Sequence, residues 1–261
     1  MNEETKIGGC LSASTLKIIA TVFMVFDNAF MKFPEMGSYW HLITRFVAPL
    51  FAYLMVDGFF HTRSREKYMG RLWIAAVLMQ IGNIISSILL GQFAVRDNIF
   101  LTLAIGFTII YFLDKSRSAV MPQRVLYILC AILIMAVSLY VDAHRIPFIF
   151  GSYIIVEGGL QLLPFIVFMY IFHNRKILQS LSSIALSIFI LFFYGGPEMF
   201  FTQGFDYFCF ASEWLGCMVV PFILLYNGQK GNSKIPGKYF FYVFYPLHLW
   251  VIAIVAYIIK H

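Results

Sequence analysis

The chain has 261 residues, of which 61% are hydrophobic and only 12% are charged, with a net charge of +6 and a mean hydropathy of +0.80. A soluble domain carries about 25% charged residues and about 45–50% apolar ones, so this composition excludes a soluble globular protein, a disordered chain and a disulfide-stapled scaffold. It predicts instead that lipid solvates most of the surface.

Nine apolar runs, interrupted by charged residues, glycine or proline, follow one another along the chain. They cover residues 15–32, 42–60, 71–90, 98–114, 123–141, 148–172, 177–194, 207–226 and 239–259. A membrane helix needs about 20 apolar residues, whereas a barrel strand needs about ten residues of alternating character, so these runs predict helices. The expected fold is all-α: a polytopic membrane bundle of about nine transmembrane helices, in a single domain over residues 1–261.

The basic residues are distributed unevenly between the two sides of these predicted helices. With the N-terminus inside, the inner segments hold most of them: Lys6, Lys17, Arg63, Arg65, Lys67, Arg71, Lys115, Arg117, Arg124, Arg175, Lys176, Lys230, Lys234 and Lys238. The outer segments keep Lys32, Arg45, Arg96, Arg145 and Lys260. Because cytoplasmic loops are enriched in Lys and Arg, we expect a cytoplasmic N-terminus and an external C-terminus.

Two kinds of partner are not expected from the residues. The positive charge follows the loops and forms no basic stripe with stacking aromatics, so nucleic-acid binding is not predicted. The four cysteines are scattered, and no two form a CxxC pair, so no metal site is predicted either.

Several ionisable residues lie inside the apolar runs, where each costs a few kcal/mol and commonly marks function. They are Asp27, Arg45, Asp57, Glu157, Glu213 and His248. Arg45 and Asp27 form the obvious pair, which would act as packing between helices. One arginine does not neutralise the three carboxylates expected in the outer half, however, so a polar or substrate-lined cavity that opens outward is the alternative.

A group of cations lies at the inner end of the second run. Arg63, Arg65, Lys67 and Arg71 follow closely on Asp57 and His61. The cations either fix topology or hold the phosphates of a cytosolic nucleotide-containing cofactor, since Arg and Lys bind phosphate well. The sequence contains no Gly-x-Gly-x-x-Gly or Walker motif, so such a cofactor would not be held as in Rossmann or P-loop proteins.

The residue types leave two classes of function open. A proton-coupled transporter of a polar metabolite would use intramembrane carboxylates, usually with repeat symmetry. A membrane transferase would use a histidine or carboxylate base together with a cationic donor site. No convincing internal repeat is present, which favours the transferase.

Four stretches of the chain, in this order, resemble the TraX family of polytopic membrane proteins: residues 16–28, 45–63, 98–106 and 241–249. The founding member of that family acetylates the N-terminus of conjugative pilin. The family is distantly similar to the acyltransferase-3 group and to the heparan-glucosamine N-acetyltransferases. The resemblance implies an acyltransferase of the bacterial cytoplasmic membrane, which moves an acetyl group from cytosolic acetyl-CoA to an amine or hydroxyl at the outer face.

The resemblance also implies the partners of the protein. The acyl acceptor would be a peptide N-terminus, an amino sugar or a small amine, and membrane lipid would surround the helices. Homodimer formation is left open.

One departure from the family pattern concerns the catalytic base. The family usually has Asp-His at the end of the first stretch, whereas this chain has Asp27 followed by Asn28, which cannot take up a proton. Either the protein is a catalytically inactive relative or another residue serves. The heparan-glucosamine enzymes have Asn at the similar position and a histidine about a dozen residues later, and here His41 follows Asn28 by thirteen.

The resemblance therefore implies that His41 is the base. Asp27 would orient the local network, and Asn28 would hydrogen-bond the acyl carbonyl or oxyanion. The alternative is that His41 is a histidine in a surface loop. His248, near the kink expected at Pro246, is the second candidate base; a histidine that satisfies the kinked backbone is the alternative there.

The remaining site residues are expected to bind the two substrates. Acetyl-CoA would contact Asp57, His61, Arg63, Arg65, Lys67, Arg71 and Asn98, and the acceptor would contact Arg45, Glu157, Glu213, Tyr242 and Tyr245.

Overall fold

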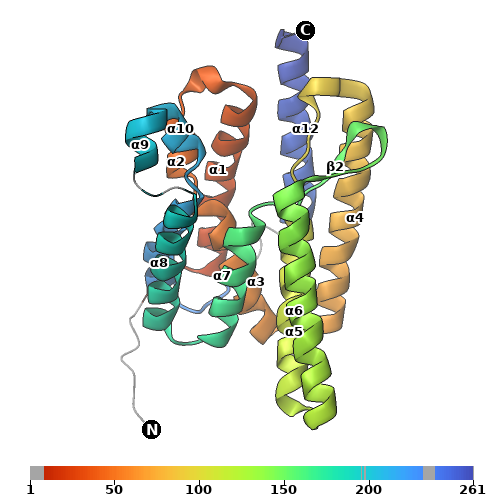
Figure 1. The fold of residues 1–261 in the computed structure, drawn as a ribbon, viewed down its shortest axis with the longest axis vertical. Coiled ribbons are helices and arrows are strands. Elements are labelled where there is room, and N and C mark those ends of the chain that lie inside the picture. The colour runs from red at the N-terminus through yellow and green to blue at the C-terminus, as the bar shows by residue number, and fades with distance from the viewer. Residues whose placement is uncertain (1–8, 195, 197, 232–238, 261) are drawn as a thin grey trace. The chain divides into compact units, whose positions relative to one another are not determined.

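The computed structural model describes residues 9–194, 196, 198–231 and 239–260 (Figure 1). Lys6, Lys234 and Lys238, which the charge pattern assigns to the inner side, lie outside the described residues. The α-helices are α1 (Ala13–Lys32), α2 (Tyr39–Ile43), α3 (Val47–His61), α4 (Arg65–Leu90), α5 (Ile99–Ser118), α6 (Met121–His144), α7 (Gly159–Ile171), α8 (Lys176–Phe193), α9 (Glu198–Gln203), α10 (Phe205–Phe210), α11 (Val220–Leu225) and α12 (Phe240–Lys260). Short 3₁₀ helices are η1 (Pro34–Met36), η2 (Gly91–Phe93), η3 (Ile149–Gly151) and η4 (Glu213–Val219), and β1 (Ile146–Pro147) pairs antiparallel with β2 (Tyr153–Ile154).

Seven helical segments of the described residues are long and apolar enough to cross a membrane. They are Ala13–Lys32, Tyr39–His61, Arg65–Phe93, Ile99–Ser118, Met121–His144, Lys176–Phe193 and Phe240–Lys260. The prediction of an all-α, polytopic membrane bundle is confirmed, and the chain is a multi-pass membrane protein. The orientation predicted from the basic residues stays a prediction.

The count of nine full-length spans is corrected in two places. In the predicted span 148–172, the chain first forms η3 and β2, with Gly151 at φ +72° and Gly158 at φ +62°, and only the 13 residues of α7 form an α-helix. Such a helix is about 20 Å long, against about 30 Å of hydrocarbon. In the predicted span 207–226, α10 is followed by the 7-residue η4 and the 6-residue α11. Both regions are apolar, but neither contains one continuous long helix.

Side-chain caps mark where three of the long helices begin. The hydroxyl of Ser12 accepts a hydrogen bond from the backbone N–H of Thr15 at the start of α1, and Ser64 does the same for Lys67 at the start of α4. Asn98 caps α5 by accepting from the backbone N–H of Leu101. Each cap satisfies one of the N–H groups that the first helical turn leaves without a partner.

The chain forms two compact units that alternate along the sequence. Unit 1 comprises residues 1–54 and 172–241, and unit 2 comprises residues 55–171 and 242–261. The single domain predicted over residues 1–261 stays a prediction.

Unit 1 joins segments that are far apart in sequence. The backbone N–H of Leu11 donates to Leu225 O at 2.9 Å, and the N–H of Asn227 donates to Leu11 O at 2.9 Å. The ring of Phe46, just before α3, stacks on that of Phe222 in α11 at 4.6 Å between centroids. The beginning of the chain and the region of α11 are thereby fixed to each other.

Unit 2 has its core among α5, α6 and α7. Helices α5 and α6 run side by side and antiparallel (Figure 1). Ile105 and Ile109 of α5, Ala131 of α6 and Leu163 of α7 are buried in one hydrophobic cluster. The carboxylate of Asp142 accepts a hydrogen bond from the backbone N–H of Leu160 at 3.2 Å and so caps the first turn of α7.

Candidate functional site

The short helix α2 brings His41 next to Asp27. Helix α1 ends at Lys32, and the chain reverses through η1 and Gly37, whose φ of +100° favours glycine. The His41 ring is thereby buried, with 7% of the residue exposed, and its Nδ1 lies 2.9 Å from Asp27 Oδ1. His41 is therefore not the exposed loop histidine of the alternative interpretation.

Asp27 is the centre of a dense group of polar contacts in unit 1. Its Oδ1 accepts a hydrogen bond of 2.6 Å from the Thr44 hydroxyl, and Arg45 Nη2 lies 2.9 Å from Oδ1 and 3.0 Å from Oδ2. The predicted pairing of Asp27 with Arg45 is confirmed. Because the carboxylate has three partners, its position is well defined.

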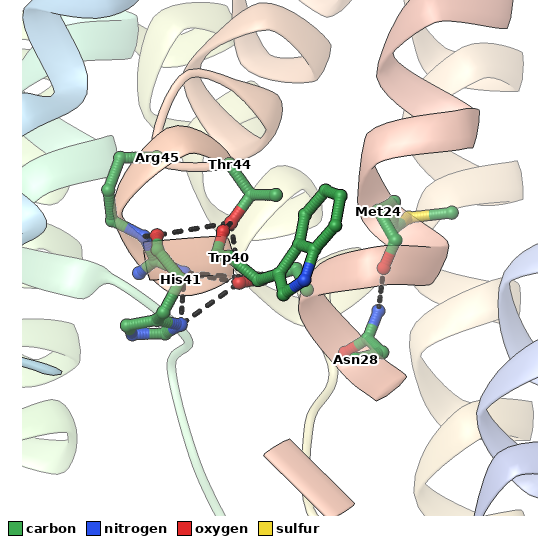
Figure 2. Close-up of polar contacts among 7 residues, drawn as sticks. Met24, Asn28, Trp40, His41, Thr44 and Arg45 are labelled. Carbon is green, nitrogen blue, oxygen red and sulfur yellow. Dashed lines mark hydrogen bonds and ion pairs between the residues drawn. The ribbon is translucent and has the colours of Figure 1, made fainter. Parts of the chain in front are cut away.

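Arg45 and Thr44 also contact the backbone of α2. Arg45 Nε donates to the carbonyl of His41 at 2.9 Å, and Arg45 Nη2 lies 2.9 Å from His41 Nδ1. The Thr44 oxygen lies 2.9 Å from Trp40 O and 3.1 Å from His41 O (Figure 2). His41, Thr44 and Arg45 are spaced i, i+3 and i+4, which places them on one side of a helical turn.

Asn28 makes a different kind of contact. Its amide Nδ2 donates to the backbone carbonyl of Met24 at 2.9 Å, one turn earlier in α1 (Figure 2). One proton of the amide group is thereby used within the helix.

Glu213 begins η4 in unit 1 and is partly buried. Among the contacts of the described residues, it is not one of the partners of Asp27, His41 or Arg45.

Three of the residues predicted to bind the acceptor meet at the start of α5 in unit 2. The Tyr245 hydroxyl donates to Glu157 Oε2 at 3.2 Å and accepts from the backbone N–H of Ile99 at 3.1 Å. The Tyr242 ring stacks on Phe100 with 5.6 Å between ring centroids.

His248, the second candidate base, lies one turn after these tyrosines in α12. It is 8% exposed, its Nδ1 donates to Phe244 O at 2.9 Å, and its ring stacks on that of Phe244. Pro246 has no N–H and leaves the carbonyl of Tyr242 without its helical donor. The carbonyl bonded by His248 is therefore not the one that the proline frees.

Asn98 links two helices of unit 2. Only 1% of the residue is exposed, its amide nitrogen donates to Ala76 O at 3.0 Å, and its amide oxygen accepts from Leu101 N at 3.2 Å. These contacts explain why an amide stands at this position. Its role in cofactor binding stays a prediction.

The predicted cation group divides into two kinds of residue. The Arg65 guanidinium forms an ion pair with Asp114 and lies 4.4 Å from the ring centroid of Phe59. Arg71 lies 5.3 Å from the ring centroid of Tyr68, whereas Arg63 and Lys67 are exposed. The charge of Arg65 is therefore already balanced within the protein.

Asp57 and His61 contact each other across one turn of α3. The Nδ1 of His61 lies 2.8 Å from the backbone carbonyl of Asp57 and 3.6 Å from its Oδ1. The His61 side chain is 63% exposed. Among the residues that the structure describes, no three His, Cys, Asp or Glu side chains gather as metal ligands would.

Two residues of these clusters, Thr44 and Asp114, are not among the site residues predicted from the sequence. Thr44 follows His41 by three positions and precedes Arg45, so its place on the same helical face could have been found from the spacing alone. Asp114 stands at the end of an apolar run among Lys115 and Arg117, and the sequence carries no signal that pairs it with Arg65.

Comparison with known proteins gives one family and one relative. The profile of the family described as TraX protein matches residues 12–256. A protein of Dichelobacter nodosus described as "Probable fimbrial assembly protein FimC, serogroup H1" is 28% identical over 265 aligned residues, which cover 91% of this chain and 93% of the relative. No solved structure matches the chain.

Proposed function

The chain belongs to the TraX protein family, and from this premise we propose that it is an acetyltransferase that takes its acetyl group from acetyl-CoA. The contact between Asp27 Oδ1 and His41 Nδ1, at 2.9 Å, carries the proposal. A carboxylate that holds one ring nitrogen of a histidine fixes the orientation and the tautomer of the ring, so that the other nitrogen can act as a general base.

His41 would act in both proton transfers of the reaction. Its Nε2 takes a proton from the acceptor as the acceptor attacks the thioester carbonyl, and a tetrahedral oxyanion forms. When the carbon–sulfur bond breaks, the imidazolium returns a proton to the leaving thiolate of CoA. Asp27 stays ionised and stabilises the imidazolium during the step, as the carboxylate of a catalytic triad does.

Asn28 is the residue that we assign to the oxyanion. Its side-chain amide would donate to the oxygen that becomes negatively charged in the transition state. His248 stays the second candidate for the base.

The donor would be held through its phosphates by the exposed cations of unit 2. Arg63 and Lys67 are exposed, in contrast to Arg65, which pairs with Asp114. Arg71, Asp57, His61 and Asn98 complete the predicted donor set. Arginine and lysine bind phosphate through charge-assisted hydrogen bonds.

The acceptor that we propose is the N-terminal amine of a pilin or fimbrial subunit. Two observations support this choice: the founding TraX member acetylates pilin, and the Dichelobacter nodosus relative carries a name that refers to fimbrial assembly. The residues predicted to contact it are Arg45, Glu157, Glu213, Tyr242 and Tyr245. We place the protein in the bacterial cytoplasmic membrane, with its N-terminus in the cytosol and the acceptor outside.

The test is acetyl transfer by the full-length protein purified in detergent. Acetyl-CoA is incubated with a peptide that has a free N-terminus, and free thiol and acetylated peptide are both measured. We expect peptide-dependent release of CoA by the wild type, and none with the same peptide blocked by N-acetylation. A transporter, or a catalytically inactive relative, would release no thiol under either condition, and that result would refute the proposal.

A further inference from the structure

His41 Nδ1 has two neighbours that require opposite hydrogen positions. Asp27 Oδ1, at 2.9 Å, can only accept, so a hydrogen bond to it requires a proton on Nδ1. Arg45 Nη2, also at 2.9 Å, can only donate, so a hydrogen bond from it requires a lone pair on Nδ1. A neutral imidazole can form only one of these two hydrogen bonds at a time. The tautomer therefore decides whether Nε2 carries a proton or a lone pair.

The other contacts of the group favour the proton on Nδ1. Arg45 Nη2 lies 2.9 and 3.0 Å from the two carboxylate oxygens of Asp27, so it has an anionic partner without the imidazole. Hydrogen bonds to a charged group are about twice as strong as neutral ones. The opposite tautomer would place the lone pair of Nδ1 against a carboxylate oxygen at the same 2.9 Å.

Asp27 and Arg45 carry opposite charges next to the imidazole. Asp27 carries one negative charge and Arg45 one positive charge, and their side chains are only 22% and 14% exposed, so solvent screens them weakly. The elements most closely packed on α2 are α1 and α10. The other titratable or charged groups that they carry, among the described side chains, are Lys17 and Lys32 of α1 and Tyr207 and Cys209 of α10. Arg45 is the cation that contacts both Asp27 and His41.

We propose that Arg45 and Thr44 are positioning residues for His41. Thr44 and Arg45 fix Asp27 so that the imidazole keeps its proton on Nδ1 and its lone pair on Nε2. This role differs from the sequence-based expectation that Arg45 binds the acceptor. It rests on the proposed function for the use of the Nε2 lone pair, whereas the tautomer is a property of the protein alone.

The tautomer can be measured without any enzymatic reaction. Long-range ¹H–¹⁵N spectra of full-length protein labelled with ¹⁵N-histidine distinguish a protonated from an unprotonated ring nitrogen, and His41→Gln identifies the His41 signals. We expect Nδ1–H with an unprotonated Nε2 in the wild type at pH 8. In Arg45→Gln, the fraction of Nε2–H should rise, because Asp27 loses the guanidinium that contacts both of its oxygens.

Three further variants separate charge, hydroxyl and fold. Arg45→Lys keeps the charge and should keep a larger Nδ1–H fraction than Arg45→Gln, while Arg175→Gln removes an exposed cation elsewhere in unit 1 and should change nothing. Thr44→Val removes only the hydroxyl and should increase the fraction of Nε2–H, and Thr44→Ser should restore the wild-type spectrum. Each variant is compared by size-exclusion profile, and the spectra of His144 serve as an internal reference for folding.

The kinetic counterpart is kcat/KM for acetyl transfer. It should fall in Arg45→Gln and in Thr44→Val in parallel with the Nε2–H fraction seen in the spectra, and Thr44→Ser should restore it. An Nε2–H tautomer in the wild type, or unchanged tautomer fractions in Arg45→Gln, overturns the inference even if the protein acetylates peptides. The expected spectra in a protein that releases no thiol would refute the proposed function and leave the inference standing.

Discussion

Arg65 of α4 and Asp114 of α5 form an ion pair, and the same guanidinium lies over the ring of Phe59. The four clustered cations, Arg63, Arg65, Lys67 and Arg71, therefore differ in how far their charge is available to bind an anion. We expect Lys67→Ala to raise the KM for acetyl-CoA several-fold without a change in thermal stability. Arg65→Ala should mainly lower the free energy of unfolding, by at most about 1 kcal/mol, because its ion pair is partly exposed. Equal effects of both variants on KM, with no effect on stability, would contradict this division.

The proposed base predicts a large and specific loss. His41→Gln should lower kcat by about 10²–10⁴-fold, the usual contribution of a general base. His144→Gln is the matched control: His144 is exposed, bonds Tyr140 O and stacks on the Tyr140 ring, so its loss should leave acetyl transfer unchanged. Should His41→Gln retain its turnover while His248→Gln loses it, the base would be His248.

The proposed oxyanion donor predicts an effect on kcat alone. Asn28→Ala should lower kcat by about 10²–10³-fold with little change in KM, because the lost hydrogen bond strengthens only in the transition state. If the amide instead serves only to bond Met24 O, kcat should stay within a factor of a few and any change should appear as lower stability. Rates at saturating acetyl-CoA together with thermal unfolding in detergent distinguish the two.

Two glycines of α4 form a natural pair for testing helix packing. A Cβ on Gly82 would lie 2.1 Å from Cζ2 of Trp250, whereas a Cβ on Gly70 would meet nothing within 4 Å. Gly82→Ala should lower the free energy of unfolding by about 1–3 kcal/mol through overpacking. Gly70→Ala should leave it unchanged or raise it by up to about 1 kcal/mol, the difference in helix propensity. A stable Gly82→Ala protein would show that Trp250 repacks freely.

The Tyr245 hydroxyl predicts a structural as well as a binding effect. Tyr245→Phe leaves the N–H of Ile99, at the first position of α5, without its acceptor, and Ile99 is only 7% exposed. An unsatisfied buried donor costs about 1–3 kcal/mol, and thermal unfolding should fall accordingly. Tyr140→Phe, at an exposed position, is the control and should unfold as the wild type does. An unchanged stability of Tyr245→Phe would leave the hydroxyl with a role in the acceptor contact only.

Most of the fold could be predicted from the lengths of the apolar runs. The errors in that prediction come from the same criterion. The first span was expected at 15–32 and α1 covers Ala13–Lys32, and the fourth was expected at 98–114 and α5 covers Ile99–Ser118. Hydropathy does not report backbone conformation, however. The region before α7 is as apolar as a span, but Pro147 in β1 and the positive φ of Gly151 and Gly158 turn it into a hairpin.

Only part of the site could be predicted, because charge pairs can be recognised in a sequence whereas short helices cannot. An intramembrane acid and a nearby arginine need each other, which is why Asp27 and Arg45 could be paired from the sequence. The second span was expected to begin at residue 42, which left His41 in a loop. Because α2 starts at Tyr39 instead, His41 is buried on the same helical face as Thr44 and Arg45. Five residues of helix therefore decide whether the histidine is a surface group or part of the network.

The backbone hydrogen bonds between Leu11 and the segment around Tyr226 have a consequence for folding during synthesis. Helices α1 and α2 are synthesised first, and the contact between Asp27 and His41 can form early because the two residues are close in sequence. The partner of Leu11 is translated only after the whole segment 55–171 of unit 2. A chain that terminates before residue 225 would therefore contain the contact between Asp27 and His41 but lack the hydrogen bonds that join the two segments of unit 1. We expect membrane quality-control proteases to degrade such a chain.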